Sequence, residues 1–230
     1  MSALSPRDEP VRAPFPRLDP SGARPAAVLA RIERWGLLAG VTGCVANALL
    51  VALWAVAIPG DARYEWTGPA NDVMGAVSVA AAVPLAWALL DHLDHPPRLT
   101  TLTRVAVAGM VVIVALSLLL VVGVIPFPVQ GAGAVACLVA IFAWLWGVGQ
   151  AARSTGRLPG GLARAARAIA TGFLGSLPLA GVAVLLPRGS IAQLATGGVA
   201  VLLGAGAFLA YPVWQLVLAG RAGRLAVPRA

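Results

Sequence analysis

Residues 105–125, VAVAGMVVIVALSLLLVVGVI, contain no Asp, Glu, Arg, Lys or His. About 20 consecutive apolar residues are what an α-helix needs to cross the hydrocarbon core of a bilayer. Five further stretches have the same character: residues 35–58, 73–90, 131–149, 168–186 and 191–218. None of them alternates polar with apolar residues, as the strands of a membrane β-barrel do. The sequence therefore predicts an all-α fold, a polytopic membrane helix bundle with six transmembrane helices.

The composition argues against a soluble protein. Hydrophobic residues make up 59% of the 230 residues and charged residues only 11%, far from the average of soluble domains. The net charge of +8 could suggest nucleic-acid binding, but the basic residues lie in short loops at the ends of the apolar stretches. No loop combines a long basic run with aromatic residues that could stack on bases. We therefore expect the lipid bilayer, and no nucleic acid, as a partner.

The arginines predict how the chain is oriented. All 17 basic residues are Arg, and all except Arg63 and Arg188 fall before the first span, after the second, after the fourth or after the sixth. These segments share one side of the membrane if all six stretches cross it. Because loops rich in Arg stay in the cytoplasm, we predict a multi-pass protein of the cytoplasmic membrane with both its N-terminus and its C-terminus in the cytoplasm.

Three regions follow from this topology. Residues 1–33 are rich in Pro and Arg, and this composition predicts a disordered cytoplasmic tail. A helix over residues 26–35 would simply continue the first span. Residues 34–220 form the predicted six-helix transmembrane domain, and residues 221–230 form a short basic cytoplasmic tail.

Repeated residues near the span ends suggest three helical hairpins. Each outgoing span ends near a proline: Pro59, Pro126 and Pro187. Each returning span carries a tryptophan toward its inner end: Trp87, Trp144 and Trp214. Aromatic belts and positive-inside arginines place the same residue types at span ends in unrelated membrane proteins. The pattern is therefore open to either interpretation.

Residues inside the spans indicate close helix packing. Gly, Ala, Ser and Thr occur throughout, and they let helix backbones approach each other in a membrane; Gly40 and Gly43 are one example. Three prolines inside spans should kink their helices: Pro84, Pro178 and Pro212. The largest polar side chains within spans are Asn47, Gln193 and Gln215. Asn47 is the deepest of them, and it either hydrogen-bonds between helices or lines a polar cavity.

The segment DHLDH, residues 91–95, contains the strongest candidates for metal ligands. His92 and His95 lie three residues apart with Asp91 and Asp94 beside them, a spacing that places ligands on one helix face. A solvated helix C-terminus looks similar, because His is favoured there. No third group of ligands completes the set elsewhere, so we expect no metal and no other cofactor.

Known membrane activities require residues that this chain does not carry. It has no lysine for a Schiff base, no histidine inside a span for haem and no HExxH motif. No carboxylate lies within a span to relay protons. We therefore predict no catalytic and no cofactor-binding residues, and a function that is not enzymatic.

The loop from Pro59 to Asp72 is the largest polar segment on the outer side. A partner or small ligand from outside would meet Tyr64 and Trp66 as apolar anchors and Glu65 and Asp72 as polar contacts. Alternatively, the aromatic side chains simply rest at the level of the lipid head groups.

Three motifs carry a resemblance to a family. They are WTGPANDVMGA at residues 66–76 followed by Pro84, GRLPGG at residues 156–161 and YPVW at residues 211–214. With them, most of residues 34–220 resembles the small, uncharacterised six-helix integral membrane proteins of high-GC Gram-positive bacteria. The resemblance implies a bacterial cytoplasmic membrane and no assigned chemistry.

Two functions are compatible with these features. The first is a non-enzymatic accessory, assembly or regulatory subunit that contacts another membrane protein, or a second copy of itself, through its helix faces. The second is a small transporter or permease subunit for a neutral or small-molecule substrate. An enclosed polar cavity lined by Asn47, Gln193 or Gln215 would favour transport, whereas a close-packed bundle with an exposed groove of small residues would favour the subunit role.

Overall fold

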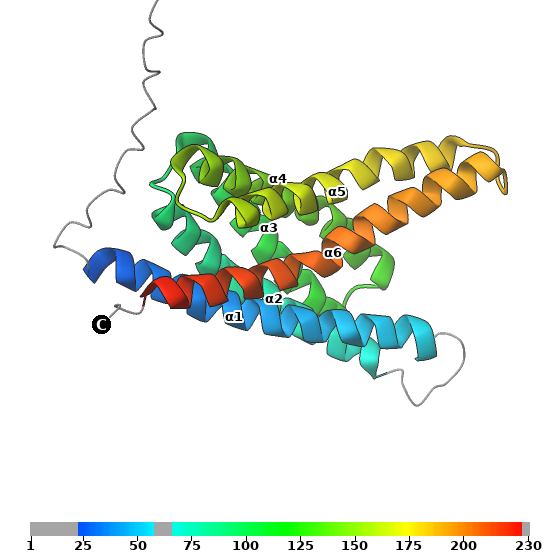
Figure 1. Cartoon of the computed structure of the whole chain (residues 1–230). Coiled ribbons are helices and arrows are strands. Elements are labelled where there is room, and N and C mark those ends of the chain that lie inside the picture. The colour runs from blue at the N-terminus through cyan, green and yellow to red at the C-terminus, as the bar shows by residue number, and fades with distance from the viewer. Residues whose placement is uncertain (1–22, 58–65, 227–230) are drawn as a thin grey trace, which may run out of the picture.

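Six long helices make up most of the chain that the structure describes (Figure 1). The computed structural model describes residues 23–57 and 66–226, and this part of the chain contains no β-strand. The helices are α1 Ala23–Ala52, α2 Thr67–His92, α3 Pro97–Val121, α4 Phe127–Thr155, α5 Gly160–Leu185 and α6 Ile191–Ala226, with a π-helical turn, η1 Leu53–Ala57, after α1. All six are long and apolar enough to cross a membrane. The predicted all-α bundle of six transmembrane helices is confirmed.

Two helices extend beyond their predicted spans. α1 begins at Ala23, so it includes the helix over residues 26–35 and the last part of the predicted tail. This extension buries Ile32 in the core. α6 continues to Ala226, past residue 220. Residues 1–22 of the predicted N-terminal tail lie outside the described residues.

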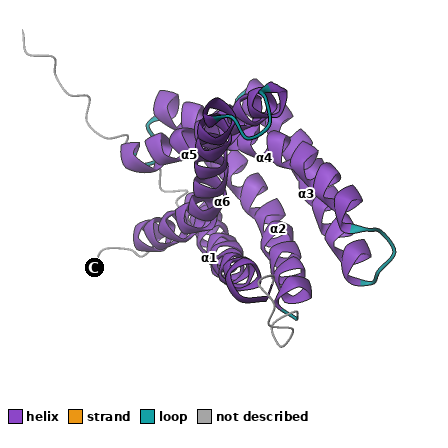
Figure 2. Cartoon of the chain, turned by 90° about the vertical axis from the view of Figure 1, so that its right-hand side faces the viewer, coloured by secondary structure: helices purple, strands orange, loops and turns teal. Residues whose placement is uncertain are grey.

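The helices pack in chain order and close into a ring. Each helix lies against its neighbours in the sequence, and α6 returns to pack against α1. Consecutive helices are antiparallel, and α1 with α2, α3 with α4 and α5 with α6 form three helical hairpins (Figure 2). The start of α1 and the end of α6 lie at the same end of the bundle (Figure 1).

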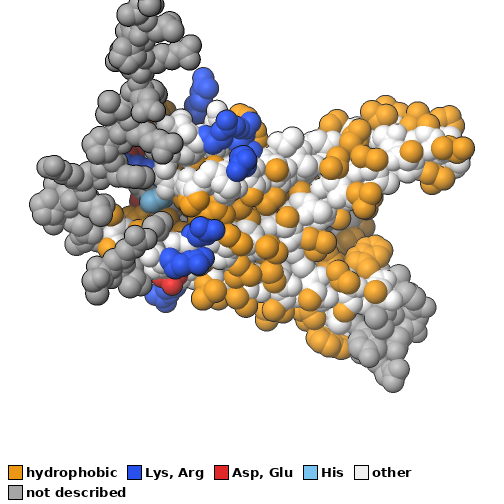
Figure 3. Space-filling view, in the orientation of Figure 1, with side chains coloured by type: hydrophobic (Ala, Val, Ile, Leu, Met, Phe, Trp, Pro, Cys, Tyr) orange, Lys and Arg blue, Asp and Glu red, His pale blue; other side chains and the backbone are white. Residues whose placement is uncertain are grey.

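Arginines gather at that end, which we call the arginine-rich end (Figure 3). Arg31, Arg98, Arg157 and Arg224 come from α1, α3, the α4–α5 connection and α6. Arg188, in the α5–α6 connection, lies at the opposite end. The middle of the bundle presents apolar side chains to its surroundings (Figure 3), as lipid-facing helices do.

The best-packed part of the core lies toward the arginine-rich end. Trp144 of α4 is fully buried, and its Nε1 donates a hydrogen bond to Thr103 Oγ1 at 3.1 Å. Trp214 of α6 is also buried, and its Nε1 donates to the Leu162 carbonyl oxygen at 3.1 Å. Two of the three tryptophans of the returning spans therefore join helices inside the bundle, because each indole N–H finds a partner there.

Two glycines of α1 lie in close contact with α6. A Cβ built on Gly40 would lie 2.6 Å from Leu216 Cγ and 2.9 Å from the Pro212 carbonyl oxygen. A Cβ on Gly43 would lie 2.8 Å from both Pro212 Cβ and Ser78 Oγ. These glycines therefore fulfil the predicted role of small residues in close packing, since any side chain would push the helices apart.

The part of α6 that precedes Pro212 diverges from α1, whereas the part that follows Pro212 packs against it (Figure 1). The α5–α6 hairpin projects away from the other helices, and its end is highly exposed: Leu185 is 87% exposed and Ile191 86%. The two helices of the hairpin still contact each other, for example at Gly204 and Ser176. The bundle is therefore closed at the arginine-rich end and splayed at the opposite end.

Candidate functional site

A central cavity lies where α6 leaves α1. Its volume is about 70 Å³, which is room for a few water molecules. Five of the helices contribute to its wall: Gly43, Ala46 and Asn47 of α1, Gly75, Ser78, Val79 and Ala82 of α2, Met110 of α3, Leu138, Ile141 and Phe142 of α4, and Phe208, Tyr211 and Pro212 of α6. None of these residues is charged, so the cavity suits a neutral and mostly apolar guest.

Asn47 is the most polar residue of this wall. It lies in the middle of the first predicted span, and its amide makes no hydrogen bond within the described part of the chain. Ser78 differs, because its hydroxyl donates to the Ala39 carbonyl oxygen at 2.8 Å. An amide at this depth has no bulk water to bond with, so Asn47 is free to bond with whatever occupies the cavity.

Tyr211 contributes a second polar group. Its hydroxyl is buried, yet it makes no hydrogen bond of good geometry, although Gln215 is its neighbour one helical turn away. The Gln215 amide is fully buried and also lacks such a bond. Pro212 has no N–H to donate to the carbonyl oxygen of Phe208. Both Phe208 and Pro212 line the same cavity. Unused hydrogen-bonding groups therefore collect in this part of α6.

Aromatic rings pack against Tyr211. Phe142 and Phe173 stack with ring centroids 4.1 Å apart. Tyr211 lies 5.7 Å from the Phe142 ring and 6.4 Å from the Trp214 ring. Each aromatic contact contributes roughly 0.5–1.5 kcal/mol beyond its buried area. The cluster holds the Tyr211 side chain in place at the cavity wall.

The sequence pointed to Asn47 but not to Tyr211. Tyr211 is the only tyrosine inside a predicted span, and it precedes an intrahelical proline, which is the signal that could have identified it. Gln193 lies elsewhere: its side-chain oxygen accepts a hydrogen bond from the Gly189 N–H at 2.7 Å, in the α5–α6 connection. Of the three polar residues proposed to line a cavity, only Asn47 does so.

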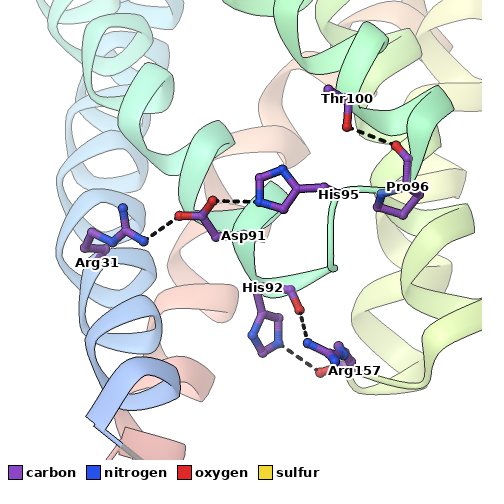
Figure 4. A network of polar contacts seen from close by, with 7 residues as sticks. All are labelled: Arg31, Asp91, His92, His95, Pro96, Thr100 and Arg157. Carbon is purple, nitrogen blue, oxygen red and sulfur yellow. Dashed lines mark hydrogen bonds and ion pairs between the residues drawn. The ribbon is translucent and has the colours of Figure 1, made fainter.

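A polar network occupies the arginine-rich end (Figure 4). Asp91 pairs with Arg31 of α1 at 2.5 Å and with His95 Nε2 at 3.1 Å. Arg157 pairs with Asp94, and its Nη1 donates to the His92 carbonyl oxygen at 3.0 Å. The α2–α3 connection is thereby joined both to α1 and to the α4–α5 connection.

The four candidate metal ligands have different partners in this network and do not converge on one point. Asp91 and His95 face each other, whereas His92 Nε2 lies 3.2 Å from the Arg157 carbonyl oxygen and Asp94 pairs with the Arg157 guanidinium. Asp94 and His95 adopt left-handed backbone angles, with φ of 60° and 53°. The chain therefore turns sharply at these two residues, and their side chains do not continue the helical spacing of Asp91 and His92. Among the described residues, no three His, Cys, Asp or Glu side chains form a group able to hold a metal ion.

A second, larger cavity lies at the opposite end of the bundle. Its volume is about 440 Å³. It is lined by Leu50, Leu53 and Trp54 near the end of α1, Gly68, Pro69, Asn71 and Asp72 of α2, Leu120 and Val121 of α3, and Phe127 of α4.

This opposite-end cavity contains one of the predicted contact residues, Asp72. Trp66, immediately before α2, is 59% exposed and is not part of the wall. Tyr64 and Glu65, the other two contact residues proposed for the outer loop, lie outside the described residues.

Comparisons with protein-family models, with curated proteins and with solved structures give no match for this chain.

Proposed function

We propose that this multispanning membrane protein binds a neutral, largely apolar molecule in its central cavity and acts as a small transporter or permease subunit. The observation that carries the proposal is the Asn47 amide, which faces a cavity at membrane depth without a hydrogen-bond partner. Asn47 is half-buried, and a polar group left unsatisfied where no water reaches it costs roughly 1–3 kcal/mol. A guest with a hydroxyl or carbonyl group would recover that cost by bonding to Asn47.

The shape of the bundle supports the same function. The cavity lies at the level of Pro212, where the N-terminal part of α6 diverges from α1 (Figure 1), and its volume of about 70 Å³ admits a small guest. The wall is apolar apart from Asn47, Ser78 and Tyr211. Ligand sites commonly have this character, with an apolar wall and a few polar groups that orient the guest.

Native mass spectrometry of the protein, extracted gently from its own membrane, tests the proposal. We expect a reproducible non-covalent small-molecule adduct on the wild-type protein and its loss in Asn47→Leu. Gly75→Leu should also remove it, since a Cβ on Gly75 meets no atom within 4 Å and the new side chain can fill the cavity. Gln193→Leu is the matched control, because this amide lines neither cavity, and it should keep the adduct. A wild-type protein without an adduct, or an adduct that survives both cavity variants, would refute the proposal.

A second candidate function is the accessory, assembly or regulatory subunit. The projecting half of the α5–α6 hairpin favours it, because Gly198, Ala205 and Gly206 of α6 are exposed there among apolar side chains. Such small residues allow a partner helix, from another membrane protein or a second copy, to approach closely. A defined heteromeric or dimeric mass that disappears in Gly198→Trp would support this function over transport.

We further propose that the arginine-rich end faces the cytoplasm of a bacterial cell, with the chain in the cytoplasmic membrane. The support is the gathering of arginines at that end (Figure 3) together with the positive-inside rule. Fusions of alkaline phosphatase and of green fluorescent protein to the C-terminus test the orientation. Fluorescence without phosphatase activity is expected, and the reverse result would overturn it.

A further inference from the structure

The cavity at the opposite end has the size of a ligand site. Its volume of about 440 Å³ falls within the range of about 300–1,000 Å³ that is usual for small-molecule pockets. Its wall combines apolar side chains of four helical segments with two aromatic rings, Trp54 and Phe127, which are 62% and 67% exposed. It is separate from the central cavity, because the two share no lining residue.

Asp72 is the charged group in this wall. It lies in the second turn of α2 and is partly buried. Among the described residues it is the only acidic side chain away from the arginine-rich end. It has no ion-pair partner among them, and its nearest polar contact is Asn71 Nδ2 at a long 3.4 Å. A carboxylate in apolar surroundings is costly unless a cation compensates its charge.

We propose that this cavity binds a hydrophobic organic cation, an ammonium group attached to an apolar body. Asp72 supplies the counter-charge, and Asn71 supplies an amide beside it. Trp54 and Phe127 also line this cavity, and aromatic rings attract ammonium groups. The ammonium can belong to a free amine or to the head group of an ethanolamine lipid. This site goes beyond the proposed function, which concerns a neutral guest in the other cavity.

Equilibrium dialysis of labelled benzyltrimethylammonium against the full-length protein in phosphatidylglycerol nanodiscs tests the proposal, with empty nanodiscs as the blank. Neopentylbenzene is the neutral probe of the same shape, because a carbon replaces the nitrogen. We expect saturable binding of the cation that excess neopentylbenzene does not displace. Asp72→Asn should weaken it by about tenfold or more, as expected for loss of a charge partner.

Two further variants test whether binding requires this cavity or only a negative charge anywhere on the protein. Val121→Trp narrows the cavity and keeps Asp72, so it should also abolish binding. Asp94→Asn removes the same charge at the arginine-rich end and should leave binding unchanged; Asn tolerates the left-handed backbone there. Equal binding by wild-type and Asp72→Asn protein, or full displacement by neopentylbenzene, would overturn the proposal.

Nanodiscs that contain phosphatidylethanolamine distinguish the two sources of the ammonium group. Weaker Asp72-dependent binding of the probe in these discs would identify the lipid head group as the occupant. Unchanged binding would identify a free amine. Neither result depends on the adduct of the central cavity, so this proposal and the proposed function can fail separately.

Discussion

Replacement of Gly40 by alanine should weaken the contact between α1 and α6. The new Cβ would lie 2.6 Å from Leu216 Cγ and 2.9 Å from the Pro212 carbonyl oxygen. The Leu216 side chain can rotate away, but the Pro212 carbonyl belongs to the backbone of α6 and cannot. Ordinary carbon–oxygen contacts are longer than about 3.3 Å, so the two helices must separate by roughly half an ångström.

The expected cost follows from two opposing effects. Overpacking a close contact costs about 1–3 kcal/mol, while Gly→Ala inside a helix gains about 0.5–1 kcal/mol. Gly175→Ala in α5 is the matched control, because its Cβ meets no atom within 4 Å and only the helix effect remains. The difference in unfolding free energy between the two variants isolates the overpacking cost, which we expect to be about 1–3 kcal/mol.

Unfolding of the purified protein by sodium dodecyl sulfate in mixed micelles, followed by tryptophan fluorescence, measures this difference. Gly40→Ala should unfold at a lower detergent fraction than Gly175→Ala. If the two variants are equally stable, α1 and α6 do not touch at Pro212, and both the ring closure and the position of the central cavity would be wrong.

Three other substitutions test separate contacts. Asn47→Leu should raise the unfolding free energy of the ligand-free protein by about 1 kcal/mol in the same assay, because it removes a half-buried amide that has no hydrogen-bond partner among the described residues. Thr103→Val should lower it by about 1–3 kcal/mol, because the buried Trp144 Nε1 loses its acceptor. Arg157→Ala should cost less than about 1 kcal/mol, because its pair with Asp94 is exposed, yet it should speed proteolysis of the α2–α3 connection.

The variants Thr103→Val and Arg157→Ala each have a control nearby in the chain. Thr101→Val changes an exposed threonine of α3 and should leave stability unchanged. Arg153→Ala removes an arginine that makes no ion pair among the described residues, and it should not affect proteolysis. A loss of stability in Asn47→Leu would contradict our interpretation, since it would mean that the amide already stabilises the bundle.

The sequence could predict the spans but not the positions of the polar groups. Residues such as 105–125 are recognisable as a span because length and lack of charge are properties of the segment itself. The face that each helix turns toward its neighbours is not visible, because these helices are apolar on all sides and lack the amphipathic stripe that indicates a buried face. For this reason Trp144 and Trp214 looked like interface residues, although they lie in the core.

The candidate site was predictable only in part for the same reason. Asn47 and Asp72 stood out as polar residues within or beside apolar segments. That Asn47 faces a cavity with Tyr211, 164 positions further along the chain, depends on how α1 and α6 meet at Gly43 and Pro212. Within the DHLDH segment, Asp91 pairs with Arg31 and Asp94 pairs with Arg157. These pairs likewise depend on which connections meet at the arginine-rich end.

The sequence by itself determined the class of this protein, six apolar helices with arginines gathered in alternate connections. Hydrocarbon excludes charge and unpaired backbone groups, so each span has to form its own hydrogen bonds as a helix wherever it later packs. Only the tertiary structure decided that the ring closes through α1 and α6, that α6 diverges at Pro212 and which residues line the central and the opposite-end cavity. Contact between helices depends on the shapes of the side chains where two helices cross. The sequence of one span alone does not show which other span it will pack against.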